Sequence, residues 1–187
     1  MPDLIARTWW IIALRGVLTL LFGFAAFLIP HDSQGPLRTL FGTFAIADGL
    51  VALVASVRFA RSGGAWRFLS GEGALGTVLG FVALTSPWLP KAALAALIAI
   101  WAIGTGGLTI AAALRLKDRI ANEWLWIASG VASILFGMLI AIFPLVTIAL
   151  WSLVVVAYAV VAGVALLVLA LFLRRLLKRR RGEIART

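Results

Sequence analysis

The chain has 187 residues, a formal net charge of +10 and no cysteine. Hydrophobic residues make up 63% of it and charged residues 13%, whereas soluble domains have about 45–50% and about 25%. A soluble core of this size could not enclose so much apolar surface, so the composition predicts an integral membrane protein. The absence of cysteine excludes disulfides, thiolate metal sites and thiol catalysis.

Six apolar stretches are long enough to cross a bilayer as helices, which takes about 20 residues. In chain order they cover about residues 9–29, 38–58, 66–86, 91–114, 124–143 and 145–173. The connections at 31–36, 88–91 and Pro144 are short, and those at 59–65 and 116–123 are slightly longer. Backbone polar groups find no partner in lipid, so the predicted fold class is all-α, a polytopic membrane protein with six transmembrane helices. No small-residue cleavage pattern follows the first stretch, so we expect it to be retained.

The basic residues predict the orientation of these helices. Of the 17 Lys and Arg residues, only Arg15, Arg38 and Lys91 lie away from the side that carries both chain ends. Positive residues collect on the cytoplasmic side, so both termini are expected to be cytoplasmic. The segment 174–187 is then a basic cytoplasmic tail, with membrane lipid, including anionic lipid, as its expected partner. Because the basic residues lie between apolar runs and in this tail, nucleic acid is not an expected partner.

An internal repeat with a constant step of 57 residues organises the chain. It relates Gly16, Gly73 and Gly130; Gly23, Gly80 and Gly137; Pro30, Pro87 and Pro144; Gly49, Gly106 and Gly163; and the aromatic positions Phe44, Trp101 and Tyr158. The repeats cover about residues 9–65, 66–122 and 123–179 of a single membrane domain, 1–187. Each repeat holds two spans, so the repeats are parallel helical hairpins. A pseudo-threefold arrangement is the simplest way for the three hairpins to form a closed bundle.

The repeated glycines are candidate helix-packing positions. Gly16 and Gly23 are about two helical turns apart and therefore share one face. Small residues allow helices to approach closely in a membrane, and Gly76 adds a Gly76-x-x-x-Gly80 pair to the third predicted helix. That face serves packing within the chain or self-association into a homo-oligomer; the sequence leaves both open. The three repeated prolines are expected to end the odd-numbered helices on the outer side.

Three ionisable residues lie inside predicted spans, where charge is costly and often functional. Arg15 and Glu72 occupy the same repeat position, about 9 Å from the cytoplasmic end, and Asp48 lies about 15 Å deep. The third repeat has Ser129 and Ala162 at these positions, and Thr105 replaces Asp48 in the second. One hypothesis is a charge network in which Arg15 is neutralised by Glu72, Asp48 or both. It would serve either as a structural pair or as part of a proton or ion path.

No catalytic or metal-binding motif accompanies these charges. A single histidine, His31, and no cysteine cannot supply the usual zinc ligands. The His-Glu-x-x-His, Gly-x-Ser-x-Gly and phosphate-loop patterns are absent, so we expect no enzyme and no cofactor. Six of the tryptophans lie near predicted span ends and are interpreted as an interfacial belt: Trp9, Trp10, Trp66, Trp88, Trp124 and Trp126.

The first two predicted helices carry the most specific sequence features. Residues 9–30 read WWIIALRGVLTLLFGFAAFLIP and residues 41–50 read FGTFAIADGL. This R-G, F-G and P pattern resembles the HdeD family of bacterial acid-resistance membrane proteins, and the resemblance extends through all three repeats. It implies a six-span protein of the bacterial inner membrane and a non-enzymatic role in stress or acid resistance. The alternative function is a small transporter or channel for protons or a small solute that uses Arg15, Asp48 and Glu72.

Overall fold

The protein is a bundle of long helices in a computed structural model that describes residues 9–29, 34–60, 66–115, 123–143 and 151–184. The helices are α2 (Trp9–Leu28), α3 (Gln34–Phe59), α4 (Trp66–Thr85), α5 (Lys91–Arg115), α6 (Glu123–Ile142) and α8 (Trp151–Ile184). No strand occurs within these ranges. The predicted all-α fold class is confirmed.

Five helices, α2, α3, α4, α5 and α8, are long and apolar enough to cross a membrane, judged by length and composition. The fifth predicted span, in α6, has a shorter apolar stretch at Trp126–Ile142. Together these apolar helices suggest a multi-pass membrane protein. The sixth predicted span begins in residues 145–150, outside the described residues, and α8 continues beyond residue 173 to Ile184.

The second span begins earlier than predicted. We expected a turn over 31–36, but α3 already begins at Gln34 and contains Pro36. Proline is tolerated in the first helical turn because its missing N–H would have no helical partner there. α4 ends at Thr85, two residues before Pro87, and Leu89 N donates to Ser86 O in the turn that follows. Pro30, Pro144 and most of the two inner connections, 61–65 and 116–122, lie outside the described residues.

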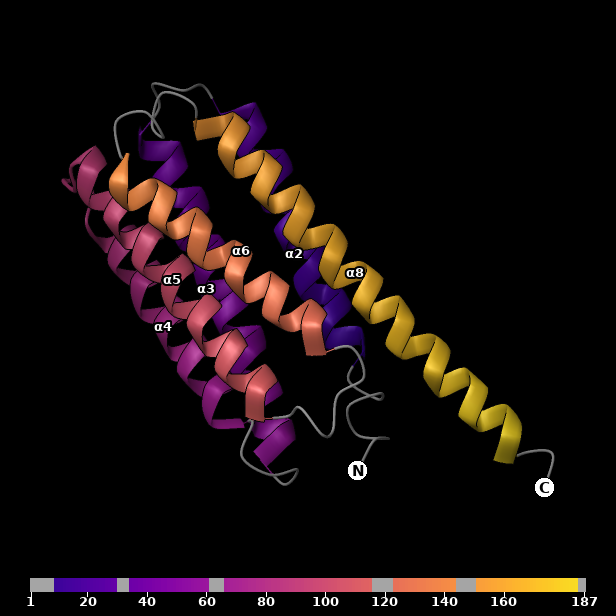
Figure 1. Ribbon diagram of the computed structural model, residues 1–187. Coiled ribbons are helices and arrows are strands. Elements are labelled where there is room, and N and C mark those ends of the chain that lie inside the picture. Colours follow the sequence, from indigo (N-terminus) through magenta and orange to yellow (C-terminus); the bar gives the residue numbers. More distant parts are fainter. Residues whose placement is uncertain (1–8, 30–33, 61–65, 116–122, 144–150, 185–187) are drawn as a thin grey trace.

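The most extensive helix contacts join neighbouring repeats. α3 packs most closely with α4, α5 with α6, and α2 with α8, while the two helices of each predicted hairpin touch less, α6 and α8 least of all. Figure 1 shows α2 and α8 side by side along much of their length. The first and last helices of the chain thus close the bundle. α2 begins and α8 ends at the same end of it, which we call the basic end because Arg58, Arg115 and Arg174 lie there.

Pairs of glycines from the repeat lie in all three extensive interfaces. A Cβ placed on Gly73 would lie 2.6 Å from the carbonyl oxygen of Gly49, and one on Gly106 would lie 2.6 Å from that of Gly130. The α2–α8 interface has the corresponding pair, with a Cβ on Gly163 3.1 Å from Gly16 O. The other predicted glycines also face a neighbouring helix: Gly76 contacts Ala45, Gly80 contacts Gly42, Gly137 contacts Ala99 and Gly23 contacts Ala159.

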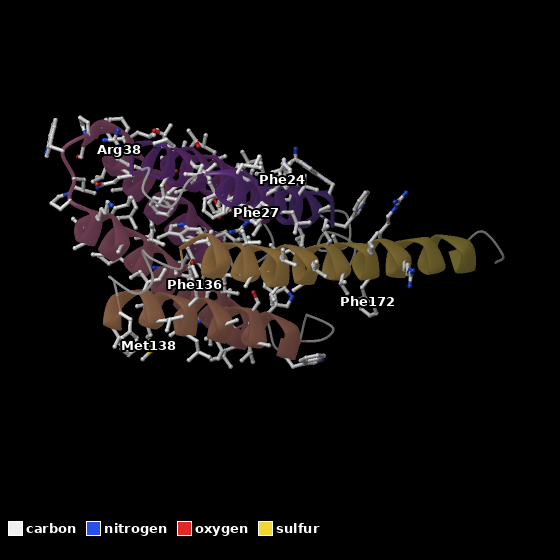
Figure 2. All side chains as sticks on the ribbon, turned by 90° about the horizontal axis from the view of Figure 1, so that it is seen from above. Phe24, Phe27, Arg38, Phe136, Met138 and Phe172 are labelled. Atoms are coloured by element: carbon white, nitrogen blue, oxygen red, sulfur yellow. The ribbon has the colours of Figure 1, made fainter. Side chains whose placement is uncertain are left out.

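The bundle is apolar outside and partly polar inside. Large side chains such as Phe24, Phe27 and Leu135 are exposed, and Met138 and Phe172 extend from the outer surface (Figure 2). Within the described ranges, the buried polar and charged residues are Thr19, Asp48, Ser56, Glu72, Thr105 and Ser133. Soluble monomers rarely expose apolar patches of this extent, so this distribution agrees with a lipid environment.

Adjacent glycines on α5 provide a test of this packing. Gly106→Ala should destabilise the protein by about 1–3 kcal/mol, because its Cβ would overlap the α6 backbone. Gly107→Ala is the matched control, since a Cβ there meets nothing within 4 Å. Thermal unfolding of both variants in detergent micelles, followed by circular dichroism, measures the difference. Equal unfolding midpoints would contradict close packing at Gly106.

Candidate functional site

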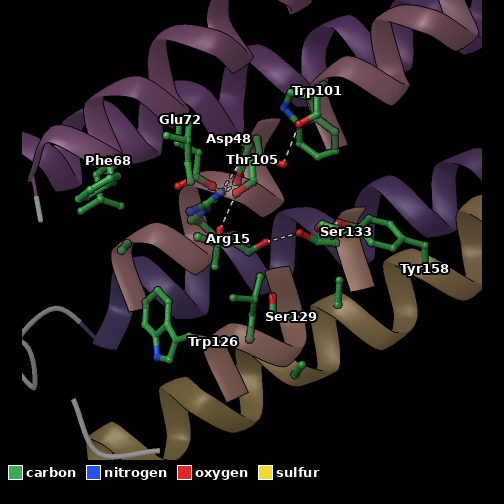
Figure 3. A pocket seen from close by; sticks show the side chains of 18 of the residues that line it. Arg15, Asp48, Phe68, Glu72, Trp101, Thr105, Trp126, Ser129, Ser133 and Tyr158 are labelled. Atoms are coloured by element: carbon green, nitrogen blue, oxygen red, sulfur yellow. Dashed lines mark hydrogen bonds and ion pairs between the residues drawn. The ribbon is translucent and has the colours of Figure 1, made fainter. Parts of the chain in front are cut away.

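Arg15, Asp48 and Glu72 come together at the centre of the bundle (Figure 3). Arg15 Nε donates to Asp48 Oδ1 and Arg15 Nη2 donates to Asp48 Oδ2, both at 2.7 Å. Two parallel bonds of this kind match the planar guanidinium to the carboxylate and are among the strongest hydrogen bonds in proteins. Arg15 on α2 is thereby joined to α3.

Glu72 adds a third helix to the cluster. Arg15 Nη2 also donates to Glu72 Oε1, at 2.5 Å. The side chains of Asp48 and Glu72 are 5% and 8% exposed, and that of Arg15 is 19% exposed. Within the described part of the chain, no hydrogen bond reaches the second Glu72 oxygen. One guanidinium therefore faces two buried carboxylates, and the cluster has one negative group in excess.

The local sequence explains how Arg15 is held. Its neighbour Gly16 lies against Gly163, which brings the α2 backbone close to α8. Thr19, one turn further along α2, donates to Arg15 O at 2.8 Å. The guanidinium then points toward Asp48 and Glu72 (Figure 3).

A cavity of about 110 Å³ adjoins the cluster. It is lined by all three members of several repeat positions: Arg15, Glu72 and Ser129; Asp48, Thr105 and Ala162; and Phe44, Trp101 and Tyr158. The remaining lining residues are Thr19, Phe68, Leu69, Leu108, Thr109, Ala112, Trp126, Ser133, Ala165 and Leu166. The cavity thus has a charged wall from the first two repeats, whereas the third repeat lines it with uncharged residues, among them the small Ser129, Ala162 and Ala165.

Aromatic side chains separate the cluster from the opposite end of the bundle. Phe22 and Phe44 stack with ring centroids 4.3 Å apart, and Phe44 and Phe41 make edge contacts with Trp101. Phe136 stacks on Tyr158 at 4.1 Å. We call these six residues, with Tyr158 included, the aromatic layer: Phe22, Phe41, Phe44, Trp101, Phe136 and Tyr158. The hollow enclosed among them measures about 10 Å³.

The repeat positions that form this layer differ in their polar partners. In the third repeat, Tyr158 Oη and Ser133 Oγ are hydrogen-bonded at 2.5 Å and bridge α8 to α6. In the second repeat, Trp101 takes the place of Tyr158 and Gly76 that of Ser133. Trp101 Nε1 faces Gly76 and has no hydrogen-bond partner among the described residues. The second repeat thus leaves a buried donor where the third has a satisfied pair.

Sequence reasoning did not assign several of these residues to the site. Trp126, interpreted as part of an interfacial belt, lines the cavity, and its buried Nε1 has no partner among the described residues. The spacing of Trp126 to Ser129 and Ser133 could have indicated its place in the cavity wall, because residues three and seven positions apart share a helix face. Trp9 and Trp10 lie at the basic end beneath Arg174 and Arg58, with 5.0 and 5.1 Å between guanidinium carbon and ring centre.

No group of His, Cys, Asp and Glu suited to a metal ion occurs among the described residues. The site holds ion pairs, hydroxyls, indoles and small apolar side chains. Such groups are suited to binding a small polar ligand or to fixing the packing of the helices.

Comparison with known proteins identifies a family. Residues 14–76, 71–142 and 128–182 each match the family described as a short repeat of unknown function (DUF308). These matches cover most of the chain, so the protein belongs to this family, and the predicted three repeats are confirmed. No curated protein and no solved structure matches the chain. The narrower relation to HdeD stays a prediction.

Removing one partner of the cluster should be costly. Arg15→Met leaves Asp48 and Glu72 as two buried carboxylates without a counter-charge, so we expect a loss of about 3–5 kcal/mol in stability. Asp48→Asn leaves Arg15 paired with Glu72 and should cost less. Ser129→Ala, at the repeat position of Arg15, is the control and should change stability by no more than about 0.5 kcal/mol. Denaturant unfolding in micelles measures the order; an Arg15→Met variant as stable as Ser129→Ala would contradict it.

Proposed function

We propose that this chain is a six-span protein of the bacterial inner membrane, of the HdeD type, that catalyses no reaction and contributes to stress or acid resistance. It would act through the central charge cluster and its cavity. The apolar helices, the short-repeat family and the likeness of residues 9–30 and 41–50 to HdeD proteins support this proposal.

One observation favours a non-transporting role over transport. The aromatic layer blocks the interior of the bundle between the charge cluster and the end opposite the basic end. A water molecule needs about 10–15 Å³ and two to four polar partners. The hollow within the layer measures about 10 Å³, and of the described residues that line it only Thr19, Trp101 and Tyr158 have polar side-chain atoms. A proton or ion crossing from Asp48 to the opposite end would therefore meet a dry segment.

The proposal of no catalysis rests on the chemistry of the lining residues. Ser129 and Ser133 line the cavity, but activating a serine requires an adjacent base such as histidine or lysine. The lining residues in the described part of the chain include neither histidine nor lysine. Both carboxylates already accept hydrogen bonds from Arg15, which leaves them poorly suited to act as a general base.

Transport of a small solute is the second candidate. It is favoured by the cavity of about 110 Å³ beside the cluster. Helices that only pack against one another do not need a cavity of this size. In this case the aromatic layer would have to open during each cycle.

The proposed arrangement is three parallel hairpins around a pseudo-threefold axis, with both termini in the cytoplasm. The equivalent glycine pairs in the three extensive interfaces support the axis. The gathering of Arg58, Arg115 and Arg174 at the end where α2 begins supports the orientation.

The orientation can be tested with single cysteines, because the chain has none of its own. Trp88→Cys, in an exposed turn, should react with a membrane-impermeant maleimide in spheroplasts. Ala60→Cys, exposed at the other end of α3, should react only after the membrane is opened. The opposite pattern would reverse the orientation, and labelling of both sites in sealed spheroplasts would contradict a membrane topology of this kind.

Proton flux in proteoliposomes tests the choice between the two candidates. With a pH gradient and a pH-sensitive dye inside, wild type, Asp48→Asn and Glu72→Gln should all match empty vesicles. Flux or solute uptake above the empty-vesicle level that Asp48→Asn abolishes would overturn the proposal in favour of transport. Thr85→Val, an exposed position on α4, serves as the control variant.

A further inference from the structure

We propose that the central cavity binds a small organic ammonium ion that also carries an oxygen acceptor, such as an amino alcohol. This inference rests on the proposed function, because it assumes a cavity that retains its ligand. It begins from the charges, the size and the unpaired donor of the cavity.

The charge of the lining calls for a cation. Arg15 and Asp48 form a neutral, doubly bonded pair, and Glu72 accepts a single bond from a nitrogen that Asp48 already shares. Among the described residues, Arg15 is the only basic residue that lines the cavity. An excess buried carboxylate is costly unless it is paired, and a ligand with one positive charge would balance the Glu72 carboxylate.

The volume of the cavity limits the ligand to a small molecule. An apolar cavity of about 150 Å³ is large enough to bind benzene, and a single water needs about 10–15 Å³. At about 110 Å³, the cavity exceeds the needs of one water and accommodates a molecule slightly smaller than benzene. A bare metal ion would leave most of this space empty.

The walls suit an ammonium group. The rings of Phe44, Phe68, Trp101, Trp126 and Tyr158 line the cavity, and aromatic faces attract ammonium groups, tryptophan most strongly. Thr105 and Ser129 add hydroxyl oxygens that can accept ammonium N–H groups. An anion would instead meet the carboxylates of Asp48 and Glu72.

Trp101, at the edge of the cavity, holds a donor that an oxygen on the ligand would satisfy. This residue is 7% exposed, lines the cavity and has an indole N–H without a partner in the described part of the chain. A buried donor without an acceptor costs about 1–3 kcal/mol, and an indole nitrogen can only donate. A ligand hydroxyl would take the place of the serine that Gly76 replaces in this repeat. A neutral acceptor keeps the ligand's net charge at +1, which a carboxylate would cancel.

Isothermal titration calorimetry on the full chain in an uncharged detergent tests the proposal. Ethanolamine, which carries one ammonium and one hydroxyl, should bind saturably with a stoichiometry near one. Ethylene glycol, its uncharged counterpart, should bind at least tenfold more weakly, as should propylammonium, which lacks the oxygen. Equal heats for ethanolamine and ethylene glycol, or no saturable binding of ethanolamine, would overturn the proposal.

Two variants separate the contacts. Glu72→Gln keeps the size of the side chain and should weaken ethanolamine binding at least tenfold. Trp101→Phe keeps a ring but removes the donor, so it should weaken ethanolamine and leave propylammonium unchanged. Thr85→Val is the control. If Glu72→Gln fails to fold, Trp101→Phe alone decides: unchanged ethanolamine affinity in a folded Trp101→Phe protein contradicts the assigned role of the indole.

The same group occurs free in solution and as a lipid headgroup, and vesicle composition separates these sources. Vesicles of phosphatidylglycerol with phosphatidylethanolamine are compared with vesicles in which phosphatidylcholine replaces the ethanolamine lipid. Ethanolamine affinity that falls in the first set identifies the headgroup as occupant, whereas equal affinity identifies a free solute; either supports the site. Binding without flux overturns neither proposal. If ethanolamine does not bind and no proton flux is observed, only the proposed ligand is overturned.

Discussion

The bundle is organised around one buried guanidinium. Arg15 is located where a lone charge would be strongly unfavourable, and its fixed fork of N–H groups must therefore find carboxylates at defined positions. Asp48 supplies two of these bonds and Glu72 a third. Because the three residues come from α2, α3 and α4, satisfying Arg15 fixes the relative position of three helices. The glycine pairs of the interfaces permit the close approach that this geometry needs: Gly49 with Gly73 between α3 and α4, and Gly16 with Gly163 beside Arg15 itself.

The three repeats pack in the same way, but they place different polar residues at the centre of the bundle. Each extensive interface has its glycine pair, so all three repeats use the same way of bringing helices together. The positions that face the centre differ: arginine, glutamate and serine at one level, and aspartate, threonine and alanine at the next. Packing needs small residues at every interface, whereas a single arginine can be satisfied by only a few carboxylates. The third repeat therefore needs no charges at these positions, and it has a hydrogen-bonded Ser133–Tyr158 pair in the same region.

Much of this was predictable from the sequence, and the reasons for the misses are physical. The 57-residue step and the apolar runs predicted an all-α chain of three repeats, because both are visible in one dimension. The depths of Arg15, Glu72 and Asp48 followed from the helical rise. Their meeting could only be offered as a hypothesis, because depth does not specify which way a side chain faces. Trp126 was interpreted as part of an interfacial belt from its position near a span end, and that position alone gave no sign that the residue also lines the cavity. The extensive pairing between repeats rather than within hairpins could not be read from connection lengths, since a short loop brings helices near without specifying which faces they bury.

The cavity itself follows from the broken symmetry. Arg15 and Asp48 fill the centre on the side of the first repeat, but the corresponding positions of the third repeat are Ser129 and Ala162. Together with Ala165, which lies on α8 like Ala162, these small side chains leave unfilled space opposite the charges. α6 and α8, which carry this wall, also make the fewest contacts of any sequential helix pair in the described bundle. Bulky apolar residues in place of Ser129, Ala162 and Ala165 would have closed the gap and left only a structural ion pair. That these positions are small, polar or both, while the aromatic layer beyond them is tightly stacked, favours a space kept for a ligand over a packing defect.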